Sequence, residues 1–265
     1  MEKRIKVLYN VIDFVKGQTM DLNDKLNIVD GENLKFRNEI KYVVTEAELA
    51  LISGRISPIM KKDSHVGPNG IYRIRSTYFD DLNDSCFYEN ENGTDKREKF
   101  RVRIYDASDK RITLECKFKE RSMTRKESTP ITREMYEKMV DGTFSIPDDR
   151  RDDKLLRKFY QRYKKDGLRP RIIVAYERTP FVYHVGNVRV TFDKNIGYSD
   201  KVENLFDEYL PLRPVMPVGR HVLEVKYDEL LPTFIYGPMN LRDLRQETYS
   251  KYYLSRSFSL KHMYK

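Results

Sequence analysis

Alternating polar and apolar residues predict β-strands along most of this chain. Residues 36–44 alternate in this way, and further runs rich in β-branched and aromatic residues follow. These runs cover residues 71–79, 99–106, 111–119, 171–178, 187–193 and 221–228. Because side chains two positions apart on a strand share a face, several of these runs have one charged face and one apolar face.

Helical spacing and capping signals predict helices between the strands. Four apolar residues recur at helical spacing in residues 4–16, and Thr45 with Glu48 forms a capping box that opens a helix over about residues 46–60. Further helices are predicted over residues 133–140, 150–165 and 248–261, with a partly helical stretch at 81–94. The helices are inserted between some strands and do not follow each one. This order predicts an α+β fold built on a closed antiparallel β-barrel with helices packed on the outside.

The domain organisation follows from the absence of linkers and repeats. No Gly/Pro/Ser-rich linker divides the 265 residues and no long period repeats. We therefore predict one domain over residues 31–265 and a separable N-terminal helical extension over residues 1–30. Two cysteines are too few for a disulfide framework, and no apolar run approaches the ~18 residues that span a bilayer. We expect a soluble cytoplasmic protein. If it has a separate membrane protein as partner, we expect it to lie at the inner face of that membrane.

An excess of basic residues favours polyanionic partners. The chain has 50 Lys+Arg against 41 Asp+Glu, a formal net charge of +9. This charge alone does not choose among nucleic acid, anionic lipid and polyphosphate. The choice depends on whether the cations lie on a solvated outer face or on strand faces that point inward.

Charged residues two positions apart recur on the predicted strands. The pattern occurs as Glu39-Ile40-Lys41, Arg101-Val102-Arg103, Glu115-Cys116-Lys117 and Glu224-Val225-Lys226, and Arg37 and Lys119 extend two of these faces. Taken strand by strand, a sheet with its charged face in water is the more frequent structure. If the predicted helices cover the apolar faces instead, the charged faces point at one another inside a barrel. Mixed charges make such an interior tolerable, because Lys and Arg bind phosphate oxygens and carboxylates bind divalent metals.

Eight short motifs make this sequence similar to a known family. They are FRNEIKY (36–42), YFDD (78–81), KFRVRIYD (99–106), LECKFKE (114–120), YERTPF (176–181), VRVTFD (188–193), VLEVKYD (222–228) and YSKY (249–252). In order and spacing they resemble the VTC domain, the catalytic module of the vacuolar transporter chaperone complex and a branch of the triphosphate tunnel metalloenzymes. The resemblance covers about residues 34–260. It implies an enzyme that makes inorganic polyphosphate from ATP with a divalent metal, Mn²⁺ or Mg²⁺, by adding γ-phosphoryl groups to a chain inside the tunnel.

The resemblance also implies roles for individual residues. Those that would hold the triphosphate and the chain are Lys41, Arg101, Arg103, Lys117, Arg178, Arg189 and Lys251. Further phosphate contacts would come from Lys119, Ser250, Lys226 and Lys126, the last in the looser segment TRKES. Glu224 would be the metal ligand, while Glu39 and Glu115 remain charge-balancing partners without a settled role.

The chain departs from the wider superfamily at two places. Arg37 stands where the superfamily's Glu-x-Glu-x-Lys begins with a carboxylate, so one metal ligand is missing and a polymerase-like site is favoured over a more acidic triphosphatase site. Arg178 shares a strand face with Ile172, Val174 and Tyr176, so we predict that a bulge or a strand end turns it inward.

Three other functions stay open at this point. A tripolyphosphatase or nucleoside triphosphatase would use the same fold, and a non-catalytic polyphosphate sensor would keep the cations without turnover. An RNA-binding barrel ranks last, since the 19 tyrosines are assigned to packing and not to base stacking, and we do not expect a nucleic-acid partner. The basic helix at residues 150–165 is assigned to a solvated face.

Overall fold

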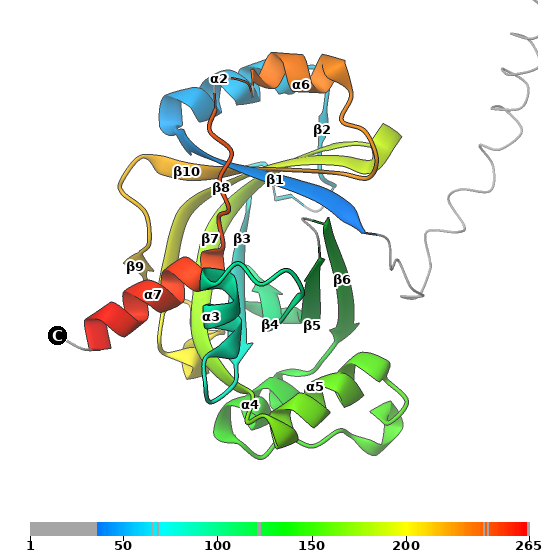
Figure 1. The fold of residues 1–265 in the computed structure, drawn as a ribbon, viewed down its shortest axis with the longest axis vertical. Coiled ribbons are helices and arrows are strands. Elements are labelled where there is room, and N and C mark those ends of the chain that lie inside the picture. Colours follow the sequence, from blue (N-terminus) through cyan, green and yellow to red (C-terminus); the bar gives the residue numbers. More distant parts are fainter. Residues whose placement is uncertain are drawn as a thin grey trace, which may run out of the picture. The chain divides into compact units, whose positions relative to one another are not determined.

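Eight antiparallel strands close into a barrel in the computed structural model (Figure 1). The structure describes residues 36–263 except 65, 68, 121–122, 241 and 243. The barrel strands are β1 (Arg37–Thr45), β3 (Tyr72–Asp80), β4 (Arg97–Tyr105), β5 (Ser108–Glu120), β6 (Met123–Pro130), β7 (Arg169–Tyr183), β8 (Val188–Ser199) and β10 (Arg220–Tyr227). Their order around the ring is β7-β3-β4-β5-β6-β1-β10-β8, and pairing of β7 with β8 closes it. The predicted α+β barrel is confirmed.

Two short strands and six helices complete the described part of the chain. The strands β2 (Lys61–Lys62) and β9 (Arg213–Pro214) pair with β7 and β8 outside the ring. The helices are α2 (Glu46–Ile56), α3 (Ser85–Glu91), α4 (Arg133–Asp141), α5 (Lys154–Lys165), α6 (Thr233–Met239) and α7 (Lys251–Met263), and short 3-10 turns lie between some of these elements. No helix among the described residues is long and apolar enough to cross a membrane.

Local signals explain where the predicted helices begin. The capping box of Thr45 and Glu48 opens α2 as predicted, with both reciprocal hydrogen bonds present. The helix predicted from residue 150 starts later, because Asp153 accepts a hydrogen bond from the backbone N–H of Leu156 and so caps α5. The extension predicted over residues 1–30 lies outside the described residues and stays a prediction.

Helices cover the outer faces of the barrel on two sides (Figure 1). On one side α4 and α5 pack on the outer faces of β4 and β5, where Val102, Leu114 and Phe159 are fully buried. On the other side α2 and α6 pack on β1, β8 and β10, where Leu223 and Val225 are fully buried. Burying a large apolar side chain stabilises the fold by about 1.5–3 kcal/mol, so these two cores favour the arrangement in which apolar faces point outward and charged faces inward.

The structure adds a strand to those that the sequence predicts and lengthens several of the others. Segment TRKES, for which no strand is predicted, lies within β6 and pairs with β5 along its whole length. β7 continues past residue 178 to Tyr183, and β8 continues past residue 193 to Ser199. These segments are polar or contain proline, so their local pattern does not predict a strand. They are extended because they form hydrogen bonds with neighbouring strands.

Candidate functional site

The charged strand faces point into the barrel. Residues directly opposite each other on antiparallel strands share a face, and the register pairs Lys41 with Glu224, Arg101 with Glu115, and Arg178 with Asp193. The predicted interior is thus confirmed. The inward-facing cations include Lys41, Lys99, Arg101, Arg103, Lys117, Lys119, Lys126, Arg178, Arg189 and Lys226, and the inward-facing carboxylates include Glu39, Glu115, Asp193 and Glu224. The cations therefore far outnumber the carboxylates.

Glu115 holds three cations on neighbouring strands. Its carboxylate accepts hydrogen bonds from Arg101 Nε at 2.7 Å and from Lys126 Nζ at 3.0 Å, and Arg103 Nη1 lies 3.8 Å away. Burial raises the pKa of Glu115, but the charges of Arg101, Arg103 and Lys126 outweigh it and hold the pKa well below its usual value. Glu115 is therefore an anionic counterion that sets the spacing of two arginines.

Glu39 and Glu224 form a second cluster with three lysines. Lys41 Nζ lies 2.8 Å from Glu39 and 3.6 Å from Glu224, and Lys226 Nζ lies 2.5 Å from Glu224 and 3.9 Å from Glu39. Lys117 Nζ donates to both oxygens of Glu39 at 2.8 Å. The two carboxylates, which come from neighbouring strands, thus share two ammonium groups, those of Lys41 and Lys226.

This pair of carboxylates suits a divalent metal. Mg²⁺ and Mn²⁺ prefer hard oxygen ligands, and Mg²⁺ is usually held by one or two carboxylates with phosphate oxygens completing its shell. Two carboxylates that already share ammonium groups fit that donor set, even though no group of three or more metal-ligating side chains occurs among the described residues. Arg37, which stands where the superfamily pattern begins with a carboxylate, pairs through its Nε with Asp228 at 3.0 Å.

Asp193, which we did not predict, organises the third cluster. It accepts two hydrogen bonds from Arg178, at 2.6 and 2.7 Å, and Lys251 Nζ lies 2.6 Å away. Arg178 also lies 3.9 Å from Glu224, which links this cluster to the second one. Asp193 is the last residue of the motif VRVTFD. No lysine lies two positions after it on the strand, so the Glu-x-Lys pattern that identified the other acids did not reveal it.

The prediction that a bulge or a strand end turns Arg178 inward is wrong. β7 pairs with β3 without a shift from Ile172 to Arg178, so Arg178 keeps the face of Ile172, Val174 and Tyr176, and that whole face points inward. A bulge does occur in the β7–β8 pair, but its extra residue is on β8, where Asn195 has a φ of 53°. Part of the barrel interior is therefore apolar. Arg178 reaches the interior from the same strand face as these apolar residues, without a bulge.

Tyrosine rings contact many of the interior cations. The Tyr176 ring centroid lies 5.3 Å from the Arg178 guanidinium and 4.9 Å from Lys251 Nζ. The Tyr78 ring lies 5.8 Å from the Arg101 guanidinium, and its hydroxyl accepts a hydrogen bond from Arg101 at 3.0 Å. Cation–π contacts of this kind stabilise a buried cation by about 0.5–2 kcal/mol. Tyr176, assigned from its spacing to packing, also serves as a neutral support for two cations.

The N-terminal end of α7 brings Ser250 and Lys251 to the interior. Ser250 Oγ caps the helix by accepting from the Tyr253 N–H at 3.3 Å, and it also accepts from Lys99 Nζ at 3.3 Å. Lys41 Nζ donates to the Tyr249 carbonyl at 3.0 Å. Sequence reasoning missed Lys99 as a site residue, although it extends the Arg101-x-Arg103 pattern by two positions.

Arg189 and Lys119 lie at the margins of this set. Arg189 Nη2 binds Asp63 at 2.8 Å and the Tyr72 hydroxyl at 2.9 Å, while its cross-strand partner is Lys226. Lys119 pairs across the strands with Arg97 and Thr124. Burial lowers the pKa of Lys119. The structure thus brings every predicted site residue to the inner surface, and it divides most of them among three acid-centred clusters.

Two interior lysines should couple phosphate binding to protonation. Burial lowers the pKa of Lys117 to about 7 and that of Lys99 to about 8. A bound polyanion favours the ammonium form and raises both values, so affinity should be highest below pH 7 and fall as the pH rises from 7 towards 9. Calorimetry of tripolyphosphate binding at pH 8 in buffers of different ionisation enthalpy should detect net proton uptake.

Comparison with a Lys117→Met variant isolates the contribution of the protein from the ionisation of tripolyphosphate itself. The variant should take up fewer protons at pH 8 than the unchanged protein. Equal proton uptake by the two proteins would contradict a depressed pKa at Lys117.

Comparison with family models decides which family this barrel represents. The model of the VTC domain matches residues 36–259, a range that takes in all eight barrel strands and most of α7. The chain belongs to the VTC domain family. The resemblance inferred from the eight motifs is therefore confirmed.

One solved structure shows the same fold at low sequence identity, and a second is similar to this chain more distantly. The "putative adenylyl cyclase HpAC1" from Hippeastrum, described as revealing a dominant triphosphatase activity, is 13% identical, with a TM-score of 0.50 over 83% of this chain and 95% of that one. A "putative adenylate cyclase" from Bacillus halodurans is 11% identical, with a TM-score of 0.47 over 82% of this chain and 94% of that one. No curated protein sequence matches this VTC domain.

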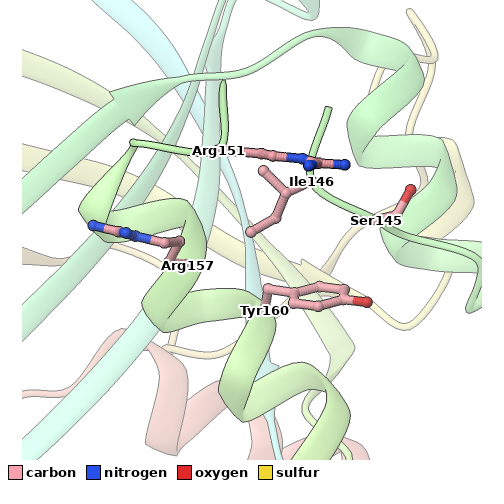
Figure 2. Close-up of a pocket in the computed structure, with 5 residues that line it drawn as sticks. All are labelled: Ser145, Ile146, Arg151, Arg157 and Tyr160. Carbon is pink, nitrogen blue, oxygen red and sulfur yellow. The ribbon is translucent and has the colours of Figure 1, made fainter. Parts of the chain in front are cut away.

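A surface hollow of the VTC domain lies outside the barrel (Figure 2). It has a volume of about 470 Å³ and is lined by Ser145, Ile146, Arg151, Arg157 and Tyr160. In Figure 2 the guanidinium of Arg157 points away from that of Arg151, and Arg151 pairs with Asp148 at 2.6 Å. Ligand sites gather several convergent polar groups, which this hollow lacks. The barrel interior is therefore the candidate site of the VTC domain.

Proposed function

We propose that this VTC domain is an ATP-dependent polyphosphate polymerase that works in the barrel interior. The observation that carries the proposal is the large excess of buried or half-buried inward cations over carboxylates, spread over seven strands and the start of α7. Buried like charges are costly unless they are paired, so an interior with this excess is completed by a polyanion. A chain of phosphates is narrow, densely charged and long enough to contact several strands at once.

The three clusters suggest a division of labour. Arg101, Arg103 and Arg178 offer planar guanidinium forks to phosphate oxygens, and the lysines add compact charges between them. Glu224 together with Glu39 would hold a divalent ion, which would neutralise charge on the transferring phosphate. An oxygen of the terminal chain phosphate attacks the γ-phosphorus of ATP, a new P–O–P link forms, the β–γ bridge breaks and ADP leaves. Such transfer needs alignment and charge neutralisation but no protein nucleophile.

A tripolyphosphatase or nucleoside triphosphatase is the second candidate. The proximity of Glu39 and Glu224 favours it, because two carboxylates can both bind a metal and orient a water. The triphosphatase activity named for the Hippeastrum protein agrees with this alternative. A non-catalytic polyphosphate sensor is the third candidate, since internal acids already balance part of the cationic charge. A separate membrane protein as partner and a cytoplasmic location stay predictions from the resemblance.

Product analysis with ATP and Mn²⁺ tests the proposal. We expect ADP and a ladder of long-chain polyphosphate on a gel, in amounts that grow with time and vanish with EDTA. Orthophosphate or pyrophosphate without longer chains would replace the polymerase with the hydrolase. Tight binding of polyphosphate with no metal-dependent turnover of ATP would replace it with the sensor.

A further inference from the structure

A fully buried carboxylate at the end of β3 joins three elements. Asp80 accepts hydrogen bonds from the backbone N–H groups of Asp81 and Cys86 at 2.9 Å and of Phe87 at 3.1 Å, which ties it to the start of α3. Its Oδ2 also accepts a hydrogen bond from the Tyr252 hydroxyl on α7 at 2.5 Å. Asp80 makes none of the phosphate-site contacts described above.

Tyr252 stands between this carboxylate and the interior cations. Its ring stacks on Tyr78 with centroids 5.3 Å apart, and Lys99 Nζ lies 5.3 Å from the same ring. The preceding residue, Lys251, reaches Asp193. The first turn of α7 is thus attached to the barrel by Tyr252 on one side and by Lys251 on the other.

Other contacts attach the remainder of α7 independently. Arg256 binds Asp84 at 2.9 Å, and Ser259 donates to Asp200 at 2.5 Å. Loss of the Tyr252 hydroxyl would therefore leave the helix docked while loosening one attachment of its first turn.

We propose that the Asp80–Tyr252 hydrogen bond positions Lys251 and the first turn of α7 against the phosphate chain, which makes Asp80 and Tyr252 positioning residues of the site. This inference rests on the proposed function, because it assumes that the interior binds phosphate chains. The hydroxyl fixes the rotation and depth of the first turn, whereas the stacked ring supplies packing. An ammonium group acts on phosphate through its distance, so a small displacement of Lys251 weakens binding.

Tyr252→Phe tests the inference because it removes only the hydroxyl. We expect the affinity for tripolyphosphate, measured by calorimetry without metal, to fall about tenfold, the size expected when a hydrogen bond to a charged acceptor is lost. Tyr163→Phe is the matched control, since Tyr163 is equally buried but lies in the outer core with its hydroxyl on the Lys138 carbonyl. The control should bind tripolyphosphate as the unchanged protein does.

A double-mutant cycle with Lys251→Ala separates positioning from general destabilisation. If Tyr252 acts through Lys251, Tyr252→Phe should change the affinity by less than about twofold when Lys251 is already absent. An equal loss of affinity in both backgrounds, or an unchanged affinity in the single variant, would overturn the inference. Failure of the unchanged protein to bind tripolyphosphate would instead overturn the proposed function.

Discussion

Replacing Glu224 with glutamine is expected to lower metal-dependent ATP turnover by about 10²–10³-fold. The variant keeps the shape of the side chain but loses the charge that would bind a divalent ion together with Glu39 and the phosphates. Tripolyphosphate binding without metal should stay the same or strengthen, because one negative charge leaves a cationic interior. The measurements are turnover against Mn²⁺ concentration and calorimetry in EDTA.

Glu115→Gln is the matched control for that experiment. Glu115 is an equally buried interior glutamate, but its described ion-pair partners are Arg101, Arg103 and Lys126, none of which it shares with another carboxylate. We expect this variant to change the KM for ATP while keeping the Mn²⁺ concentration that gives half-maximal turnover. Parallel shifts in Mn²⁺ dependence for both variants would remove the metal role from Glu224.

Replacing Arg101 with alanine should lower tripolyphosphate affinity about 100-fold. The change removes a buried guanidinium and leaves Glu115 with two of its three cations, so the interior also becomes more negative where phosphate binds. Arg101→Lys keeps the charge but loses the planar guanidinium fork. Its affinity for tripolyphosphate should lie between that of the unchanged protein and that of Arg101→Ala. Calorimetry of the three proteins at one salt concentration measures the series.

Thermal unfolding of Arg101→Ala distinguishes lost binding from lost folding. Glu115 keeps Arg103 and Lys126 as partners in this variant, so its buried charge stays compensated and we expect only a small fall in melting temperature. A large fall in melting temperature that parallels the loss of affinity would mean that Arg101 serves the fold and not the ligand.

Periodicity made much of this site predictable before the structure. The i, i+2 spacing of Glu39 with Lys41 and of Arg101 with Arg103 places each pair on one face, whatever the rest of the chain does. The same rule, carried two residues further, would have found Lys99. It also led to an error at Arg178, because we assumed that an inward face cannot carry Ile172 and Val174.

The sequence by itself determined which residues share a strand face, where α2 is capped and that the cations exceed the acids, because these properties depend on neighbours within a few positions. Only the tertiary structure decided which acid holds which cation. The contact of Lys117 with Glu39 spans 78 residues, and the contact of Tyr252 with Asp80 spans 172. Such pairs form when the barrel closes and α7 docks, so the clusters around Glu39, Asp80 and Asp193 arise from cross-strand register and helix packing, which no local pattern encodes.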